Sequence, residues 1–560
     1  MKIKSDALET LQKAVGAENV ATDLATLASY AWNGGVGGMP GPKLKFWPAA
    51  VVLPGSTEEV AAIVRACNAH GLKFRPLSSG NGAMHLPQMQ GAVMIDLVRM
   101  DKIEKIDRKN SMAVIQPYAT AGRLMAEAMK VGLTCHVVGA GAGHSPLASA
   151  TSMLGIGSSG ASTGTNARNI LGLEWVTPEG EIVRIGTTGE DNWFSEEGPG
   201  IGFRGMIRGY MGAHGALGIF TRIGYKLHPW AGDKEMKLTG VFPQAGIEPS
   251  NYARFYAPVW DAPEKVAECA QRLSRSGQLF AFLRLSATAY GLVLTPTNED
   301  FVEQKEAGTL PEIAHDENRH GTQIMTQAHS AAQAAYQEKL VKKVVEETGG
   351  RFLELDPDHE KQLMRGLVTS QYVARVSRQG GGGATSFGIN DSWNLWPKAL
   401  ELAEELVEAD KSSDLMCTAD VESHWAWVHE NRQLWTEHVM MPGHKKPEGT
   451  GMAIGSFLRH LHRMDERHLG MRALIGGPIV DLFQTKSKEG VWMRRIKNSI
   501  DPNWNADASF YIPPKALPGG NMMPFIRKIL FSDKTRPFVN FVLKSGTKGA
   551  AKTAAVARKD

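Results

Sequence analysis

Two glycine-rich loops constrain this chain more than any other feature of its sequence. The first spans Gly80–Gly82 and the second spans Gly139–Gly160. Glycine lets a backbone come close to a ligand and turn its N–H groups toward it, an arrangement that suits a pyrophosphate. The first loop, within SSGNG, is equally typical of a tight turn between two strands. A bound dinucleotide would explain why the chain has both glycine-rich loops.

The second loop contains the sequence Gly155-Ile-Gly157-Ser-Ser-Gly160, which matches the GxGxxG fingerprint of nicotinamide-binding folds. That fingerprint requires a strand directly before it, a helix directly after it and an acidic residue about 20 positions further on. The preceding SPLASATSM does not resemble a buried parallel strand, and SGASTGTNAR is a poor helix start. Glu174 lies near the required distance but inside a strand pattern. The sequence therefore disfavours a nicotinamide site.

Short strands alternate with helices around the two loops. AAVVLPG, KFRPL, AVMIDL and MAVIQP predict strands, and AGRLMAEAMKVGL predicts an amphipathic helix. Ser56, with Glu59 three residues later, predicts a capping box for a helix over 57–69. LEWVTPEGEIVRIG predicts a hairpin that turns at Pro178–Gly180.

The pattern changes after Trp230, and a chain of 560 residues is in any case too long for one core. Longer helical segments, such as EKVAECAQRLSRSG and WPKALELAEELVEADKSSD, are mixed there with strand-like LFAFLRLSA. This mixture predicts a second α+β domain between about 233 and 480. RRIKNSIDPNW then predicts a last helix and turn.

Four ordered motifs resemble the FAD-binding domain of the vanillyl-alcohol oxidase/p-cresol methylhydroxylase superfamily. PAAVVLPGSTEEVAAIVRACNAHGLKFRPLSSGNG is similar to the family's opening unit with its first pyrophosphate loop. TSMLGIGSSGASTGTNARNILGLEWVTPEGEIVRIG is similar to the later small-residue loop. FRGMIRGYMGAHGALGIFTRIGYKLHP and IKNSIDPNW resemble two further signatures, so the match covers roughly 45–230 and 490–510.

The resemblance implies an α+β fold in which a PCMH-type FAD-binding domain carries an inserted, ferredoxin-like α+β cap. We expect the FAD-binding domain over 1–232, the cap over 233–480, a C-terminal return over 481–520 and a basic tail over 521–560.

The resemblance also places three sets of residues around FAD. They are Ser79, Gly80, Asn81 and Gly82 on the first phosphate loop, Gly155, Gly157, Ser158, Ser159 and Gly160 on the second, and Gly215, Leu217, Gly218 and Ile219 beside the flavin and adenosine. Covalent members commonly carry a histidine where this chain has Asn81. We therefore expect non-covalent FAD, with a covalent link from the cap left open.

Hydride transfer to a flavin needs a base for the substrate proton and one or two polar anchors. His424, oriented by Glu422, is a candidate base, and His429 could serve instead. Arg378, with Arg375 beside it, could clamp a carboxylate or phenolate. Surface arginines beside a flexible glycine run, and histidines within an aromatic packing segment, explain the same residues without catalysis.

Other histidines and one tyrosine carry weaker signals. His460, His462 and His468 are spaced i, i+2 and i+8, which does not place the first pair on one helix face. The "H.GDGN.H" metal and base motif of the 2-hydroxy-acid branch is not found in this sequence, so we predict no metal site. Tyr210 and His214 precede the Gly215–Ile219 motif and could approach the flavin or simply pack.

Composition limits the compartment and the partners. The four scattered cysteines, with no CxxC, argue against a disulfide framework and fit a reducing cytoplasm. Neither a signal peptide nor an apolar run long enough to span a bilayer is evident. The weak charge of the body, −3 over 1–521, gives no reason to propose nucleic-acid binding.

The C-terminal tail differs from the body in charge. Residues 522–560 contain nine Lys/Arg and two acidic residues, a net charge of +7. PFIRKILF places four apolar residues on one helical face, namely Phe525, Ile526, Ile529 and Leu530. Such a face with flanking cations suits an anionic membrane surface or an acidic redox partner protein. Packing of the tail on its own body is the competing interpretation.

The sequence therefore predicts a cytoplasmic, homo-oligomeric FAD-dependent dehydrogenase or oxidase. The predicted substrate is an alcohol, a 2-hydroxy acid or a para-alkylphenol, with electrons passed to a partner or to O2. The alternative is an FAD-binding electron-transfer or scaffold subunit of a larger redox complex.

Overall fold

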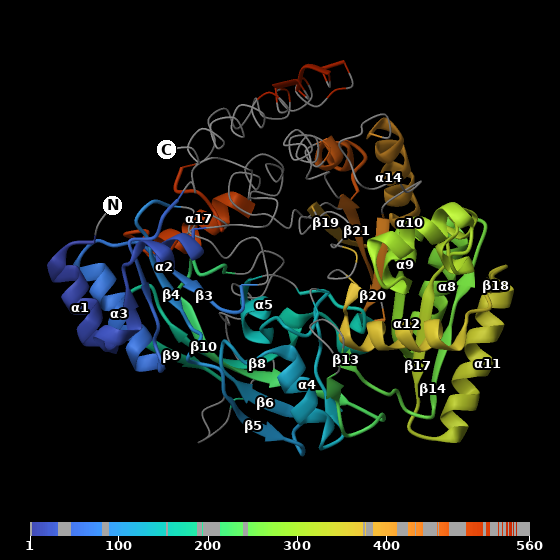
Figure 1. Ribbon diagram of the computed structural model, residues 1–560, viewed down its shortest axis with the longest axis horizontal. Coiled ribbons are helices and arrows are strands. Elements are labelled where there is room, and N and C mark those ends of the chain that lie inside the picture. Colours follow the sequence, from blue (N-terminus) through green and yellow to red (C-terminus); the bar gives the residue numbers. More distant parts are fainter. Residues whose placement is uncertain are drawn as a thin grey trace.

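A computed structural model of the chain assigns its helices and strands to two lobes (Figure 1). It describes residues 3–31, 46–80, 89–139, 141–152, 155–186, 193, 213–238, 245–372, 376, 385–410, 424–431, 433–440, 456, 459–469, 489–507 and 511–515, with scattered positions between 525 and 545. The N-terminal lobe holds two sheets, and the second lobe is built on one six-stranded sheet.

The first sheet of the N-terminal lobe is largely parallel. Its strands follow the order β1 (Val20–Ala21), β2 (Ala50–Val52), β4 (Val93–Asp96) and β3 (Phe74–Leu77). Strands β2, β4 and β3 run parallel, and helices α1 (Ser5–Val15) and α3 (Thr57–Ala69) share their core. Parallel strands of this kind require crossover connections, which α3 provides between β2 and β3.

Helix α3 has the bounds that the sequence predicted, but its cap differs from the predicted capping box. Ser56 Oγ accepts a hydrogen bond from Glu59 N at 3.2 Å, as a capping serine should. The Glu59 carboxylate accepts from Gly55 N at 2.7 Å instead of from Ser56 N. The reciprocal bond has therefore moved one residue toward the N-terminus, because Gly55 leads into the helix with its N–H turned to that carboxylate.

The second sheet of the N-terminal lobe is antiparallel. Its order is β5 (Ile103–Asp107), β6 (Met112–Ile115), β10 (Ile219–Lys226), β8 (Ile170–Val176) and β9 (Ile182–Ile185). The predicted hairpin joins β8 to β9, and Gly180 N donates to Thr177 O at 2.9 Å in its turn. Every residue of β8 is buried, so this strand lies at the centre of the lobe.

The second lobe, called the six-stranded lobe below, is an antiparallel sheet with helices on its faces. The strand order is β14 (Ala253–Tyr256), β17 (Gln323–Gln327), β16 (Leu279–Arg284), β20 (His424–His429), β21 (Gln433–Met440) and β19 (Thr385–Asp391). One face packs on α8 (Pro263–Arg275), α11 (Ala331–Glu347) and α14 (Trp396–Asp410). The α+β prediction for this region is thus confirmed, on a sheet of six strands.

Shorter elements connect these layers. They are α2 (Leu24–Ser29), α4 (Ala121–Met129), β7 (Leu133–Thr134), α5 (Pro146–Ser152), α6 (Gly160–Thr163), β11 (His228–Pro229), β12 (Lys237–Leu238), β13 (Ala245–Gly246), β15 (Pro258–Val259), α9 (Ala287–Leu294), α10 (Asn298–Ala307), β18 (Arg351–Phe352), α12 (Pro357–Thr369) and α17 (Glu489–Ile500). Within the described part of the chain, no helix is long and apolar enough to cross a membrane.

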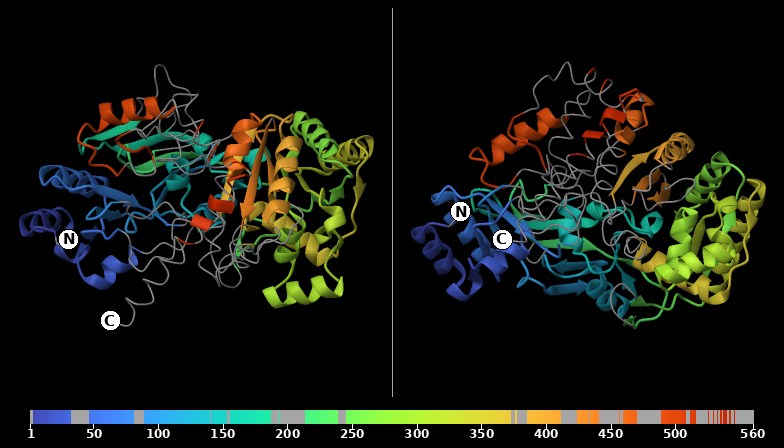
Figure 2. Two further views of the ribbon diagram at one scale, coloured as in Figure 1. Left: turned by 90° about the horizontal axis from the view of Figure 1, so that it is seen from above. Right: turned by 45° about the horizontal axis from the view of Figure 1, so that its top comes forward.

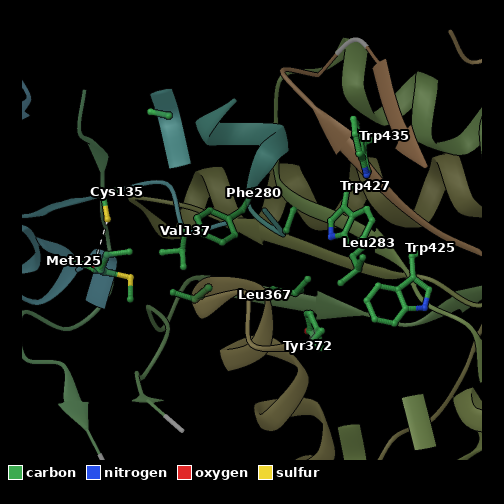
Figure 3. Close-up of a cluster of buried hydrophobic side chains, with 14 of the residues drawn as sticks. Met125, Cys135, Val137, Phe280, Leu283, Leu367, Tyr372, Trp425, Trp427 and Trp435 are labelled. Atoms are coloured by element: carbon green, nitrogen blue, oxygen red, sulfur yellow. Dashed lines mark hydrogen bonds between the residues drawn. The ribbon is translucent and has the colours of Figure 1, made fainter. Parts of the chain in front are cut away.

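One hydrophobic core continues from the N-terminal lobe into the six-stranded lobe. Along β20, Trp425 and Trp427 belong to this shared core, whereas Ala426 and Val428 belong to the helix-covered face. That alternation is the two-residue period of a strand buried on both sides. Figure 3 shows Val137 of the N-terminal lobe near Phe280 of β16, with the tryptophans beyond. The two lobes are therefore packed against each other across an apolar interface.

The segment after α17 returns to the N-terminal lobe. Phe74 N donates to Asn505 O at 2.9 Å, and Asp507 N donates to Phe74 O at 2.9 Å, which forms a parallel bridge beside β3. A buried ion pair joins Arg75 of β3 to Asp507 at 3.1 Å. Both views of Figure 2 place α17, drawn in orange-red, beside the blue and green strands of that lobe. The exact domain boundaries given above stay predictions.

Candidate cofactor and active site

The first glycine loop begins where strand β3 ends. Ser78 Oγ donates to Pro117 O at 2.6 Å, and Ser79 Oγ accepts from Ser145 N at 2.9 Å. Gly80 has φ +65°, a conformation that favours glycine. The loop thus lies at the carboxyl edge of the parallel strands, the usual ligand edge of such sheets. Asn81 and Gly82 lie outside the described residues.

The second loop meets the first at Ser145, directly before α5. Next to this junction His144 is buried, with Nδ1 bonded to Gly141 O. Its Nε2 has no hydrogen-bond partner among the described residues. Burial lowers the pKa of His144 to about 4, so the ring is neutral at physiological pH. A buried polar atom without a partner marks a place where a ligand can complete the hydrogen bonding.

The GxGxxG part of the second loop is held by backbone contacts. Gly139 N donates to Ile156 O at 2.6 Å, and a Cβ on Gly157 would lie 1.9 Å from Val137 O. The glycine at 157 is therefore required by the chain's own carbonyl, whatever ligand is nearby. Ser158 and Ser159 are both buried.

Two polar bonds of this loop reach other elements. Ser158 N donates to Ser370 Oγ, at the end of α12, at a distance of 2.9 Å. Nδ1 of the buried His136 lies 2.8 Å from Thr163 Oγ1, which in turn lies 3.1 Å from Ser159 Oγ. The six-stranded lobe and the segment before the loop, which contains His136, thus both fix its position.

The third motif forms a tight turn before β10. His214, Gly215 and Gly218 have φ values of +48°, +79° and +106°. A Cβ on Gly215 would lie 2.6 Å from Cδ of Pro76, so the turn packs directly on β3. Leu217 O accepts from Trp175 Nε1 at 2.7 Å, and both Leu217 and Ile219 are buried. The resulting turn lies between β3, β8 and the C-terminal return.

His214 belongs to this turn and is buried within it. Burial, with a contribution from the positive charge of Arg75, lowers the pKa of His214 to about 3. A histidine with so low a pKa stays neutral and binds protons weakly. Tyr210, the other residue singled out ahead of the motif, lies outside the described residues.

Of the predicted catalytic residues, the structure brings His429 to the cofactor loops. His429 ends β20 and is buried, and a Cβ on Gly160 would lie 2.5 Å from its Nδ1. Burial lowers the pKa of His429 to about 4. His424 begins the same strand, and its backbone pairs with His438. Glu422, Arg375 and Arg378 lie outside the described residues.

The histidines near residue 460 form a separate group. His460 and His462 are buried in a helical stretch, and His462 Nε2 lies 3.3 Å from Glu466 Oε1. His468 follows with φ +54°. The described residues contain no group of three or more His, Cys, Asp or Glu side chains that could hold a metal ion.

Sequence reasoning missed several polar residues of this site. Ser370, with φ +51°, reaches the loop only because α12 ends beside it, and no local pattern indicates that contact. His136 and His144 flank the first glycines of the second loop, so their position in the sequence could have drawn attention to them. Ser145 is the residue that joins the two loops.

These features fit a bound FAD. One edge of the N-terminal lobe holds the first loop, the His144 junction and the Gly215 turn. The six-stranded lobe covers the second loop through Ser370 and His429. At the junction the hydroxyl groups of Ser79 and Ser145 can donate to a phosphate, and His144 Nε2, unprotonated because Nδ1 donates to Gly141 O, can accept from a ligand hydroxyl or N–H. The apolar contact between the lobes offers cover for a flavin ring. The residues that would hold it are those of the three loops.

Comparison with known proteins supports this interpretation. Residues 48–186 match the family model described as "FAD binding domain". An uncharacterised FAD-linked oxidoreductase of Mycobacterium tuberculosis is 28% identical over 226 residues, which cover 40% of this chain and 46% of that protein. D-lactate dehydrogenase of Anaerostipes hadrus is 28% identical over 183 residues, covering 32% and 37%. The match therefore spans less than half of either relative.

The overall fold is similar to that of a solved enzyme structure. The structure of p-cresol methylhydroxylase with bound substrate superposes with a TM-score of 0.67 at 18% sequence identity. The superposition covers 90% of this chain and 96% of that one, so the likeness includes both lobes. The α+β architecture expected from the sequence motifs is confirmed.

Proposed function

Because this chain carries an FAD binding domain of the p-cresol methylhydroxylase type, we propose that it is an FAD-dependent dehydrogenase or oxidase of a small organic substrate. One observation carries the proposal: the six-stranded lobe contacts the second cofactor loop directly, at Ser370 and His429. The His429 contact places a neutral imidazole, a group that can accept a proton, beside that loop. The substrate then lies between the two lobes.

An alcohol or a para-alkylphenol is the preferred substrate class. The sequence match covers 37% of D-lactate dehydrogenase, and the structural likeness to p-cresol methylhydroxylase gives the fold alone, so the preference rests on a missing motif. The metal and base motif expected of a 2-hydroxy-acid enzyme is not found in the sequence. A 2-hydroxy acid is accordingly the second choice.

Bound FAD would accept a hydride from the substrate carbon at flavin N5. The residues of the chain would position the substrate and take its hydroxyl proton. We assign the base to His424, oriented by Glu422, or to His429, and the clamp on a phenolate or carboxylate to Arg378. His429 is uncharged at neutral pH because burial lowers its pKa to about 4, so it can accept a hydrogen bond from a substrate hydroxyl.

Anaerobic mixing of the purified protein with candidate alcohols, 4-alkylphenols and 2-hydroxy acids tests the proposal. We expect a yellow protein whose flavin absorbance at about 450 nm bleaches within seconds to minutes when one of these three substrate classes is added. His424→Ala should keep its FAD and lose the bleaching if His424 is the base. A yellow protein that no candidate reduces would instead favour an electron-transfer or scaffold subunit.

Heat or acid denaturation of the same preparation tests the cofactor assignment. The released flavin should be FAD and should separate from the polypeptide, because Asn81 replaces the histidine used for covalent attachment at that position. Flavin that stays with the denatured chain would indicate a covalent link from the six-stranded lobe. A colourless protein that cannot be reconstituted with FAD would contradict the proposal as a whole.

We also propose that the C-terminal tail binds an anionic membrane surface. Phe525, Phe538 and Phe541 expose 61%, 67% and 67% of their surface, and the tail carries a net charge of +7. Each cation near an anionic surface contributes about 1 kcal/mol, and inserted phenylalanines add to it. An acidic redox partner would use the same features.

Truncation after Gly520 should leave FAD binding intact and abolish sedimentation with anionic vesicles. Salt screens the ionic contribution to vesicle binding, so binding of the full chain should also weaken as salt rises to about 0.15 M. Neutral vesicles serve as the control, since they retain only the apolar contribution. Equal sedimentation of both forms would exclude the membrane as the partner, and loss of folding would show that the tail packs on the body.

A further inference from the structure

Lys497 of α17 is a fully buried lysine with an unusual set of partners. Its side chain is 0% exposed, and its ammonium donates to the Asp501 carboxylate, to Ala506 O and to Ala216 O. The face of Trp504 lies 5.5 Å from the same nitrogen. A buried ammonium is retained only where such partners replace its water shell, so this position is highly specified.

Asp501 completes the arrangement on the other side. Its carboxylate accepts from Asn505 N at 3.0 Å and from Ala506 N at 2.9 Å, which shapes the return segment beside β3. The ion pair therefore ties α17 and the return segment to the turn that contains Ala216. We call Lys497 and Asp501 the return clamp.

The Ala216 carbonyl belongs to a turn in which three residues within five positions, His214, Gly215 and Gly218, have positive φ. Backbone in such conformations persists only where its surroundings hold it. Ala216 N donates to Ala213 O at 2.8 Å within the turn, and Lys497 binds the carbonyl on the outside. Without the ammonium, that carbonyl would be buried without its charged donor.

We propose that Lys497 is a positioning residue, which fixes the turn over 213–218 in the conformation that FAD binds. The proposal rests on the proposed function only in naming FAD as the ligand. The return segment would thus contribute to the cofactor site through one lysine, although it is separated from the glycine loops by most of the chain.

The charges around Lys497 predict how FAD affinity responds to pH. Burial lowers the pKa of Lys497 to about 8, the charges of Asp501 and Asp507 act to raise it, and that of Lys73 acts to lower it. Among the described residues, Arg75 is a further cation of this group and is ion-paired with Asp507. Because the ammonium holds the turn, FAD affinity should be full below pH 8 and fall as pH rises through that value.

Folding stability responds to Lys497 in the opposite direction. Its pKa in the folded chain is below the ordinary value of 10.5, so the unfolded chain binds more protons between about pH 8 and 10.5. This lysine therefore makes the folded state more stable, relative to the unfolded state, as pH rises through that window. A loss of FAD affinity there cannot be attributed to unfolding caused by Lys497.

FAD titration of the apoprotein between pH 6.5 and 9.5 tests the proposal in four proteins. Wild type should lose roughly tenfold in affinity across this range, the scale of one charge-assisted hydrogen bond. Lys497→Met should bind about tenfold more weakly at pH 7 and show a flat profile. Asp501→Asn should move the midpoint to lower pH, because the opposite charge is removed.

Lys73→Met is the matched control. Lys73 Nζ binds Asn503 O at 2.9 Å and Asn505 Oδ1 at 3.1 Å, so it holds the same return segment without touching the turn. Its removal should keep the pH dependence and shift the midpoint slightly upward. If Lys497 had a merely structural role, Lys497→Met would lower the melting temperature and leave the shape of the pH profile of FAD affinity unchanged.

Amide hydrogen exchange of the apoproteins supplies a readout that needs no FAD. Peptides over 213–219 should exchange faster in Lys497→Met than in wild type or Lys73→Met. Failure of wild type to bind FAD would contradict the proposed function. The exchange data would still test the return clamp, because they need no FAD. Wild-type exchange in this turn, together with a wild-type pH profile in Lys497→Met, would overturn the inference.

Discussion

Gly157→Val should yield no folded, FAD-bound protein. A Cβ at this position would lie 1.9 Å from Val137 O, closer than two non-bonded atoms can approach. Neither side can yield easily, because Val137 lies in the core shared by the two lobes and Gly139 N is bonded to Ile156 O at 2.6 Å. Relief would require the loop to separate from Val137. Soluble yield, melting temperature and flavin content measure the effect.

The matched control is Gly277→Ala, where an added Cβ meets no atom within 4 Å. Its φ of +66° makes alanine strained, so we expect a cost of about 1 kcal/mol and full FAD content. Gly157→Ala should already fail, because the clash arises at Cβ itself. A Gly157→Ala protein with wild-type stability and flavin would show that the loop has a different backbone from the one described here.

Local signals were enough to predict much of the N-terminal lobe. Helix α3 follows from its capping serine and apolar spacing, and the β8–β9 hairpin follows from the turn residues between two apolar runs. Both depend on residues adjacent in the sequence. The order of the glycine motifs then indicated the fold through its resemblance to the p-cresol methylhydroxylase superfamily.

The reason for individual glycines could not be predicted in the same way. The sequence suggested that Gly157 leaves room for a phosphate, whereas the nearest atom on its Cβ side is the carbonyl oxygen of Val137. Gly160 likewise faces His429, which is far away in the sequence. Such contacts depend on how two lobes pack, and no local pattern encodes them.

The choice between His424 and His429 shows the same limit. In the sequence both lie in one aromatic segment, and either could be the base. The pairing of β20 with β16 and β21 sets which residues face the N-terminal lobe, and Trp425, Trp427 and His429 share one parity along the strand. That register becomes visible only in the folded sheet.

Gly160→Ala and His429→Ala should be strongly coupled. In wild type, a methyl group on Gly160 would lie 2.5 Å from Nδ1 of the buried His429, which should cost about 1–3 kcal/mol of stability. His429→Ala alone should destabilise by a similar amount, because it leaves a cavity. In the double variant the new methyl group enters that cavity, where its nearest neighbour is Val428 O at 3.1 Å. Denaturant unfolding of all four proteins should give a coupling of about 1–3 kcal/mol.

Substrate reduction of the double variant then separates packing from chemistry at His429. If the imidazole only fills space, the double variant should regain both stability and flavin bleaching by substrate. If the imidazole accepts the substrate proton, the double variant should regain stability and FAD but not bleaching. The difference from wild type should appear at every pH above about 4, where wild-type His429 is unprotonated. Additive stability effects, with no coupling, would mean that His429 does not contact Gly160. The six-stranded lobe would then contact the cofactor loop through Ser370 and through Glu430 N, which donates to Gly160 O at 2.9 Å.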